Sequence, residues 1–359
     1  IMQPGARKEE SPVVEEKITI YSIAKALGLS PSMVSRAFTP GARIDEGKRQ
    51  LVLQYAESVG YRPNKLASRL SHKAVRIGVL LVCPFDPVTN ALLRGCRLAH
   101  DRIADYKVEY HVVTVTDFED AYGQCKAALD SFSACDGVIV SVPSTPEIDV
   151  LIIEFAQKNP NIAALQQVNM KLPYVFTVKH NESVASGMAA ELIYRCVKPT
   201  DRRDVALFTG YGHSDIHIAA KKGFEEACAR LGLHIAATYD MQDTVEILES
   251  QAEALLRTRG DSLGGIYITS AVSEPLCRRV KESRLPINLV TFDTFPDIVP
   301  YLRDGTVVAT IFQNIVWQAE TAFLTMAEML ISNHQPTHRI QSIPTLVLSE
   351  NLALYEGQC

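Results

Sequence analysis

Apolar and polar positions alternate in blocks along most of the chain. Continuous apolar runs such as 77–82 are typical of strands buried on both faces, and the amphipathic segments between the runs have apolar residues at helical spacing. The runs predict strands at 76–82, 108–115, 137–142, 162–166, 205–209, 235–239, 265–268 and 289–292. Helices are predicted around 92–99 and at 121–131, 147–158, 183–196, 218–231, 245–259, 275–283 and 316–331. This alternation predicts an α/β body of two doubly wound parallel-sheet lobes, with a ligand cleft beyond the carboxyl ends of the strands.

The segment before this body has a wholly helical pattern. Apolar residues recur at helical spacing in 20–27, where Thr19 is placed as the N-cap and Gly28 as the stop. Ser30 and Pro31 then begin a second short helix directly after the first. So close a pair predicts an N-terminal all-α helix-turn-helix domain, whose second helix can enter the major groove of DNA.

A third helix is expected from Asp45 to about Ser58. It would complete the core of the small domain with one apolar stripe. The predicted stripe consists of Leu51, Val52, Tyr55, Ala56 and Val59.

The distribution of charge supports a nucleic-acid role for the N-terminal part. The chain of 359 residues has a net charge of −5. Residues 17–76 carry 11 Lys and Arg against 3 Asp and Glu, a net charge of +8, whereas residues 77–359 carry 23 against 34, a net charge of −11. A basic domain attached to an acidic body is typical of a DNA-binding module joined to a part with no attraction to phosphate.

The cysteines and the hydropathy pattern favour a cytoplasmic protein. Eight cysteines are scattered without any C-x-x-C spacing, and most lie in apolar runs, as reduced core thiols do. No apolar stretch approaches 18 residues and no signal-peptide pattern opens the chain, so no membrane partner is expected. The chain begins at Ile1, which leaves open where the natural protein begins.

Two long motifs carry a resemblance to a known family. They read ITIYSIAKALGLSPSMVSRAF and RIDEGKRQLVLQYAESVGYRPNKLASRL, and the body adds DPVTNALLRG, CDGVIVSVPS, KKGFEEACARLG, LVTFDTFPDIV, DGTVVATIFQ and LVLSENL in order. The chain resembles the LacI-type (lactose repressor) family of transcription regulators over roughly residues 18–356. The resemblance implies a periplasmic-sugar-binding-protein fold for the body.

The resemblance also implies the order of the domains. A disordered tail (1–16) and a helix-turn-helix domain (17–62) would precede a hinge helix with its linker (63–75). The effector-binding domain (76–359) would have lobe 1 at about 76–178 and 312–341, and lobe 2 at about 179–311 and 342–359. The C-terminal stretch has no leucine heptads, so a homodimer is expected rather than a tetramer.

The resemblance implies roles for eight residues at a palindromic DNA operator. Pro31, Ser32 and Arg36 match the positions that reach base edges, with Arg36 suited to a bidentate contact with guanine. Thr19, Ser35, Asn64 and Ala67 match contacts to phosphate or positions in the hinge helix, and Leu70 matches the apolar wedge that family members insert into the minor groove. Family members often have a longer side chain where Pro31 stands, so the operator sequence does not follow.

The resemblance also implies that six residues contact an effector between the lobes. They are Asp86, Thr145, His217, Ser273, Asp293 and Gln313. Carboxylates and amides suit a sugar or polyol because each accepts or bridges neighbouring hydroxyl groups. Relatives often carry an arginine that grips the effector where this chain has Ile218. His217 is expected to supply that polar contact instead, and the missing arginine disfavours an anionic effector. For Asp86, Asp293 and Gln313 a helix cap or turn remains the alternative.

Other readings of these features stay open or are disfavoured. His213 and His217, like His334 and His338, are four residues apart but lack a nearby third ligand, so neither a metal nor a cofactor is expected. Gly210 and Gly212 lack the rest of a dinucleotide fingerprint. The predicted function is a repressor controlled by a neutral sugar or polyol. The alternatives are a nucleobase or protein corepressor, an architectural DNA binder, and a sugar-modifying or hydride-transfer enzyme fused to a DNA-binding head.

Overall fold

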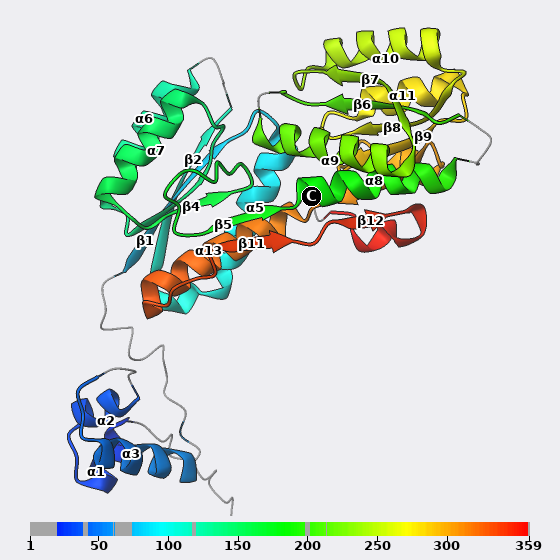
Figure 1. The fold of residues 1–359 in the computed structure, drawn as a ribbon. Coiled ribbons are helices and arrows are strands. Elements are labelled where there is room, and N and C mark those ends of the chain that lie inside the picture. Colours follow the sequence, from blue (N-terminus) through cyan, green and yellow to red (C-terminus); the bar gives the residue numbers. More distant parts are fainter. Residues whose placement is uncertain are drawn as a thin grey trace, which may run out of the picture. The chain divides into compact units, whose positions relative to one another are not determined.

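The computed structural model describes residues 20–38, 42–59, 61, 74–116, 120–197, 202–212 and 214–357 (Figure 1). The chain divides into two compact units, Ile1–His72 and Lys73–Cys359. The predicted contact residues Thr19, Asn64, Ala67 and Leu70 and the predicted hinge helix lie outside the described residues.

Three short helices form the described part of the first unit: α1 (Ile20–Leu27), α2 (Pro31–Ala37) and α3 (Glu46–Ser58). The hydroxyl of Ser30 accepts a hydrogen bond from the Met33 amide at 3.3 Å and caps α2, which begins at Pro31 as predicted. Gly28 has φ of +65°, the left-handed conformation in which glycine ends a helix without strain. The three helices enclose a small core of Ile23, Ala24, Val34, Ala37, Val52 and Ala56.

The predicted stripe on the third helix was wrong at Leu51. This side chain is 47% exposed, whereas Val52 and Ala56, one turn apart, are buried. Tyr55 and Val59 are half-buried beside them. A core of six small and medium side chains has room for a narrow stripe of α3, and Leu51 lies to one side of it.

Two six-stranded sheets form the second unit. The first, in the order β11-β5-β4-β3-β1-β2, defines lobe 1 and consists of β1 (Val75–Val82), β2 (Val108–Val115), β3 (Gly137–Ser141), β4 (Ile162–Leu165), β5 (Thr177–His180) and β11 (Arg339–Ser342). The second, in the order β12-β10-β9-β8-β6-β7, defines lobe 2 and consists of β6 (Asp204–Thr209), β7 (His234–Asp240), β8 (Leu263–Ile268), β9 (Asn288–Phe292), β10 (Val307–Phe312) and β12 (Thr345–Val347).

Helices cover both faces of each sheet, as the strand–helix alternation predicted (Figure 1). Lobe 1 has α5 (Asp86–Arg102) and α13 (Ile315–Ser332) on one face, and α6 (Ala121–Ser131) and α7 (Pro146–Lys158) on the other. Lobe 2 has α8 (Glu182–Cys196) and α9 (Asp215–Leu231) on one face, and α10 (Val245–Arg259), α11 (Glu274–Ser283) and α12 (Val299–Arg303) on the other. Three 3₁₀ helices complete the unit: η1 (Ala104–Tyr106), η2 (Phe132–Ala134) and η3 (Ser349–Leu354).

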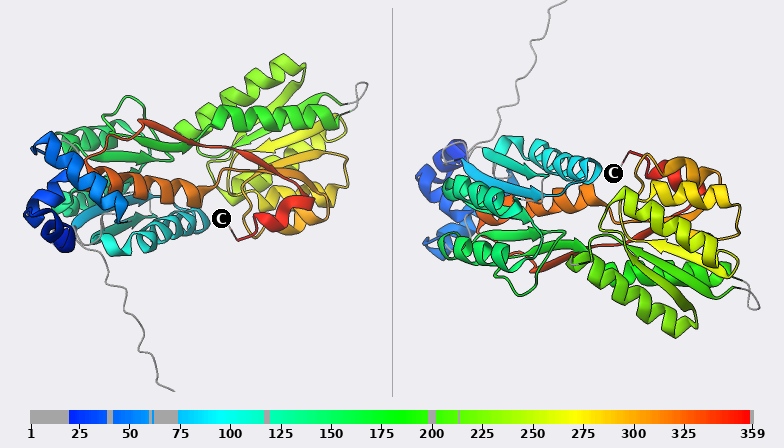
Figure 2. Two further views of the ribbon diagram at one scale, coloured as in Figure 1. Left: turned by 90° about the horizontal axis from the view of Figure 1, so that it is seen from below. Right: turned by 90° about the horizontal axis from the view of Figure 1, so that it is seen from above.

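The chain passes between the lobes three times: after β5, after β10 and between β11 and β12. Figure 2 shows the C-terminal segment, drawn in red, running from one lobe into the other. Gln313 belongs to the second passage, where its backbone carbonyl accepts a hydrogen bond from the Ser342 hydroxyl at 2.8 Å. The second and third passages are therefore tied together.

The prediction of wholly parallel sheets needs one correction. β12 pairs with β10 in antiparallel register, with Ile311 opposite Leu346. The carboxyl ends of the strands that pair in parallel face the space between the lobes in both sheets. A chain that passes directly from β11 into lobe 2 therefore runs against the direction of β10. A parallel strand would need a long connection back to the far edge of the sheet.

Within the described residues, none of the helices has the length and apolar character needed to cross a membrane.

Candidate functional site

A cavity of about 810 Å³ lies between the lobes of the second unit. Its wall is made at the carboxyl ends of strands from both sheets, the place where open α/β sheets bind ligands. The polar residues from strand ends include Ser141, Gln166, His180, Thr269, Asp293 and Gln313. Both lobes contribute to one polar surface, so a molecule held there would contact both.

Asp293 lies at the centre of the lobe 2 wall, directly after β9, and is 1% exposed. Its φ of +60° places it in the left-handed region, which aspartate tolerates better than most residues. One carboxylate oxygen accepts from the Gln313 backbone amide at 3.1 Å, and the other accepts from the Gln313 side-chain amide at 2.7 Å. Burial raises the pKa of Asp293 to about 7, while these two hydrogen bonds lower it in part.

Gln313 connects this carboxylate to the passages between the lobes. Its backbone carbonyl accepts hydrogen bonds from the side-chain amide of Gln318 on α13, at 2.9 Å, and from the Ser342 hydroxyl. Hydrogen bonds through Gln313 therefore link Asp293 to α13 of lobe 1 and to Ser342 at the third passage.

His217 and Asp243 form a second polar group on the lobe 2 wall. The Nδ1 atom of His217 is 2.9 Å from the Thr269 hydroxyl, and its Nε2 atom is 3.8 Å from an Asp243 carboxylate oxygen. The carboxylate also accepts from the Ser270 hydroxyl at 2.6 Å and from the Tyr211 amide at 3.0 Å. Burial lowers the pKa of His217, against the opposing effect of Asp243, so we treat the ring as neutral near pH 7.

The glycines after β6 allow this close packing. A Cβ atom at Gly210 would lie 2.2 Å from an Asp243 oxygen and 2.4 Å from His217 Nε2. The next amides, of Tyr211 and Gly212, donate to the carboxylates of Asp243 and Asp240. A dinucleotide site uses such amides to hold phosphate, but here carboxylates already occupy them. These contacts agree with the sequence analysis, which disfavoured a dinucleotide site at Gly210 and Gly212.

His180 was not predicted from the sequence, although it lines the cavity from the end of β5. The residue is 2% exposed, and its ring lies 5.3 Å from that of Phe292. Burial lowers the pKa of His180 to about 3, so the imidazole is neutral. Among the described residues its ring nitrogens have no hydrogen-bond partner.

The six predicted effector contacts separate into two groups. Thr145, His217, Asp293 and Gln313 line the cavity, although the Thr145 hydroxyl also caps α7 by accepting from Ile148. Asp86 and Ser273 are not among the residues that line it.

The structure places Asp86 and Ser273 outside the lining of the cavity, so their contact with an effector stays a prediction. Asp86 is exposed at the first turn of α5, where Phe85 and Val88 face the cavity instead. Ser273 is fully buried below the start of α11, and its carbonyl accepts from Cys277 at 3.1 Å. Both residues lie within three positions of residues that line the cavity, but they do not line it themselves.

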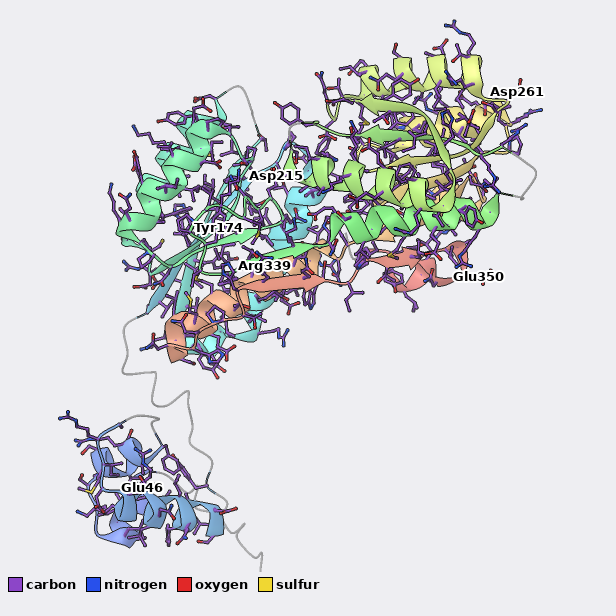
Figure 3. The ribbon with its side chains drawn as sticks, in the orientation of Figure 1. Glu46, Tyr174, Asp215, Asp261, Arg339 and Glu350 are labelled. Atoms are coloured by element: carbon purple, nitrogen blue, oxygen red, sulfur yellow. The ribbon has the colours of Figure 1, made fainter. Side chains whose placement is uncertain are left out.

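The charges around the cavity are predominantly negative. Glu147, Asp243 and Asp293 supply carboxyl groups, and the two histidines are neutral. Among the described residues, no Lys or Arg side chain lines the wall. Asp215 begins α9 outside this lining; burial raises its pKa and Asp149 adds to the shift, while Lys179 and Lys171 oppose it. Figure 3 labels Asp215 and Tyr174, which come from lobe 2 and lobe 1.

No group of three or more potential metal ligands occurs within the described part of the chain.

A separate polar surface lies on the first unit. Pro31, Ser32 and Arg36 are exposed along α2, and Ser35 is half-buried. Val34 and Ala37 occupy the opposite, buried side of the helix. The predicted base-reading side chains thus share the outward side of α2.

Comparison with known proteins identifies the family. The periplasmic binding protein domain family matches residues 99–334, well over half of the chain. The chain belongs to this family. Among solved structures, GanP, a glucose-galactose binding protein from Geobacillus stearothermophilus, has a TM-score of 0.70 at 19% identity, covering 78% of this chain and 99% of GanP. That likeness is one of fold.

The curated relatives of the chain are transcriptional regulators. DegA of Bacillus subtilis, an HTH-type transcriptional regulator, is 25% identical over 240 residues, which is 66% of this chain and 68% of DegA. PtxS of Pseudomonas plecoglossicida, another HTH-type transcriptional regulator, is 35% identical over 129 residues, 35% of this chain and 36% of PtxS. The resemblance to LacI-type regulators is confirmed.

Proposed function

We propose that this protein is a sequence-specific DNA-binding transcription regulator whose operator affinity is controlled by an uncharged sugar or polyol bound between the lobes. The observation that carries the proposal is the combination of two units in one chain. A small three-helix unit presents polar side chains on one helix, and a two-lobed unit encloses a cavity lined by apolar side chains and by polar groups from both lobes. We propose no catalytic role for either unit.

The first unit is proposed to act as a helix-turn-helix domain. α2 would enter the major groove, with Arg36 on guanine and Ser32 and Pro31 beside neighbouring bases. Thr19, Ser35, Asn64 and Ala67 remain proposed contacts of the DNA backbone and hinge, and Leu70 remains the proposed minor-groove wedge. Two copies in a homodimer would read the two halves of a palindromic operator.

The chemistry of the cavity supports an uncharged effector. Carboxylates of Asp243 and Asp293 can accept hydrogen bonds from hydroxyl groups, and the part of the wall formed by described residues offers no cationic side chain to a phosphate or carboxylate ligand. The amides of Tyr211 and Gly212 are already used by carboxylates. An anion would therefore meet repulsion without compensating donors.

Ligand control would act through the angle between the lobes. A sugar held by Asp293 and Gln313 on one side and by Thr145 and Gln166 on the other favours a closed cleft. Because Gln313 is bonded to Ser342, closure would move the passages and reposition the DNA-binding units. We propose repression relieved by the ligand. Such coupling requires that operator DNA change the affinity for the ligand by the same factor.

Thermal melting of the full chain tests the effector class. The panel contains D-glucose, D-galactose, D-ribose, D-arabinose, glucose 6-phosphate, gluconate, adenine and guanine. A ligand at 100 times its Kd adds about 2.7 kcal/mol to the free energy of unfolding. A raised Tm with a neutral sugar alone supports the proposal. A response limited to a phosphate, an acid or a nucleobase contradicts the effector class, and no response to any member contradicts control by a small sugar.

A further inference from the structure

One histidine of the cleft has ring nitrogens that bond to no described residue. Neutral imidazole has one donor and one acceptor, and leaving such groups unpaired in a protein interior costs stability. His180 is 2% exposed, yet no described residue bonds to its ring nitrogens. The ring faces a cavity rather than a packed interior, because His180 is one of the residues that line the wall.

The position of His180 gives it access to both halves of a ligand site. It ends β5, which is the last element of lobe 1 before the first passage into lobe 2. Its ring packs against Phe292 of β9, the residue directly before Asp293. A molecule bonded to Asp293 would therefore lie beside the imidazole.

We propose that His180 is a specificity-determining contact, whose imidazole hydrogen-bonds one hydroxyl group of the effector at the point where the chain crosses between the lobes. This inference rests on the proposed function, since it assigns a further residue to the same site. The ligand would supply the hydrogen-bond partner that no described residue gives to the imidazole. A ligand lacking that hydroxyl group would leave it unpaired and bind more weakly.

A comparison of stability with binding tests this role in the full chain. His180→Leu removes the hydrogen-bonding atoms and keeps an apolar volume of similar size, while His180→Gln restores a donor and an acceptor. His334→Leu is the matched control, because His334 is exposed beyond the end of α13. The measurements are Tm without ligand and Kd by calorimetry for the best-binding sugar of the panel and for each of its monodeoxy derivatives.

A histidine that contacts the ligand and a histidine that supports the fold give opposite results in these measurements. If His180 contacts the ligand, His180→Leu should keep or raise the Tm measured without ligand. The same variant should bind the parent sugar about tenfold more weakly, a loss of about 1.4 kcal/mol in binding free energy. One monodeoxy sugar should bind the wild type about tenfold more weakly than the parent does. His180→Leu should bind both equally, His180→Gln should recover part of the preference, and His334→Leu should behave as wild type.

Three results would overturn the inference. A lower Tm for empty His180→Leu would show that the ring supports the fold. Unchanged affinity for the parent sugar, or an unchanged preference over every deoxy derivative, would show that the ring does not contact the ligand. A wild-type protein that binds no panel sugar contradicts the proposed function itself, whereas binding that is insensitive to His180 contradicts only this inference.

Discussion

The buried carboxyl group of Asp293 should make the stability of the protein depend on pH in an unusual direction. Burial raises its pKa from an ordinary 3.8 to about 7. Between these two values the folded protein holds a proton that the unfolded chain has released. The contribution of this group is therefore fully present below about pH 4 and is lost as the pH rises through about 7.

The size of the effect follows from the shift. About three pKa units at 1.36 kcal/mol each give roughly 4 kcal/mol between pH 4 and pH 8. Asp293→Asn removes the titration, and asparagine also tolerates the positive φ at this position. The free energy of unfolding of the variant, minus that of the wild type, should therefore rise by about 4 kcal/mol across this range.

Urea denaturation followed by the fluorescence of the single tryptophan, Trp317 on α13, measures this difference. The buried histidines titrate in both proteins, so subtracting the wild-type value removes their contribution. Asp261→Asn is the matched control for the exchange of aspartate for asparagine, because Asp261 is exposed. A flat difference for Asp293→Asn would refute the argument that burial raises the pKa of this carboxyl group.

Further predictions concern packing and the DNA-binding unit. Gly95→Ala should lower the free energy of unfolding by about 1–3 kcal/mol in urea, since its Cβ would lie 2.3 Å from the Val316 carbonyl. Gly187→Ala is its control, with the nearest atom at 3.9 Å, and should be neutral or stabilising by up to about 1 kcal/mol. Ser30→Ala should destabilise the first unit by about 1 kcal/mol in circular-dichroism melts by removing the cap of α2, and an unchanged Tm would contradict the capping role. Arg36→Ala should weaken binding to a selected operator by about 1–3 kcal/mol in anisotropy titrations but change binding to random duplex much less; equal losses would show a phosphate contact.

The longer elements could be predicted because their patterns are strong. The strand expected at 108–115 and the helix expected at 245–259 have those same bounds in β2 and α10. Short strands of mixed polarity gave no such signal. β5 and β11 have four residues each and β12 has three, so neighbouring strands rather than their own sequences determine their conformation.

The candidate site was predicted in part for a related reason. Asp293 and Gln313 were predicted because the resemblance matches them to ligand contacts of relatives, and the structure places them directly after β9 and β10. Asp243 was missed because two consecutive residues with positive φ, Gln242 and Asp243, turn its carboxylate into the cavity. His180 was missed because the pattern did not predict β5, the short strand that ends at this residue. Such positions depend on backbone turns that hydropathy does not encode.

The central claim is that a ligand in the cleft changes the affinity of the protein for DNA. The direct test selects a duplex from a random library with the full chain, then measures the Kd of that duplex by fluorescence anisotropy with and without the neutral sugar that raises Tm. The account predicts a change in operator Kd of at least about tenfold, about 1.4 kcal/mol of coupling, and the same factor in the sugar Kd when the duplex is present. An operator Kd that is the same with and without saturating sugar would contradict it.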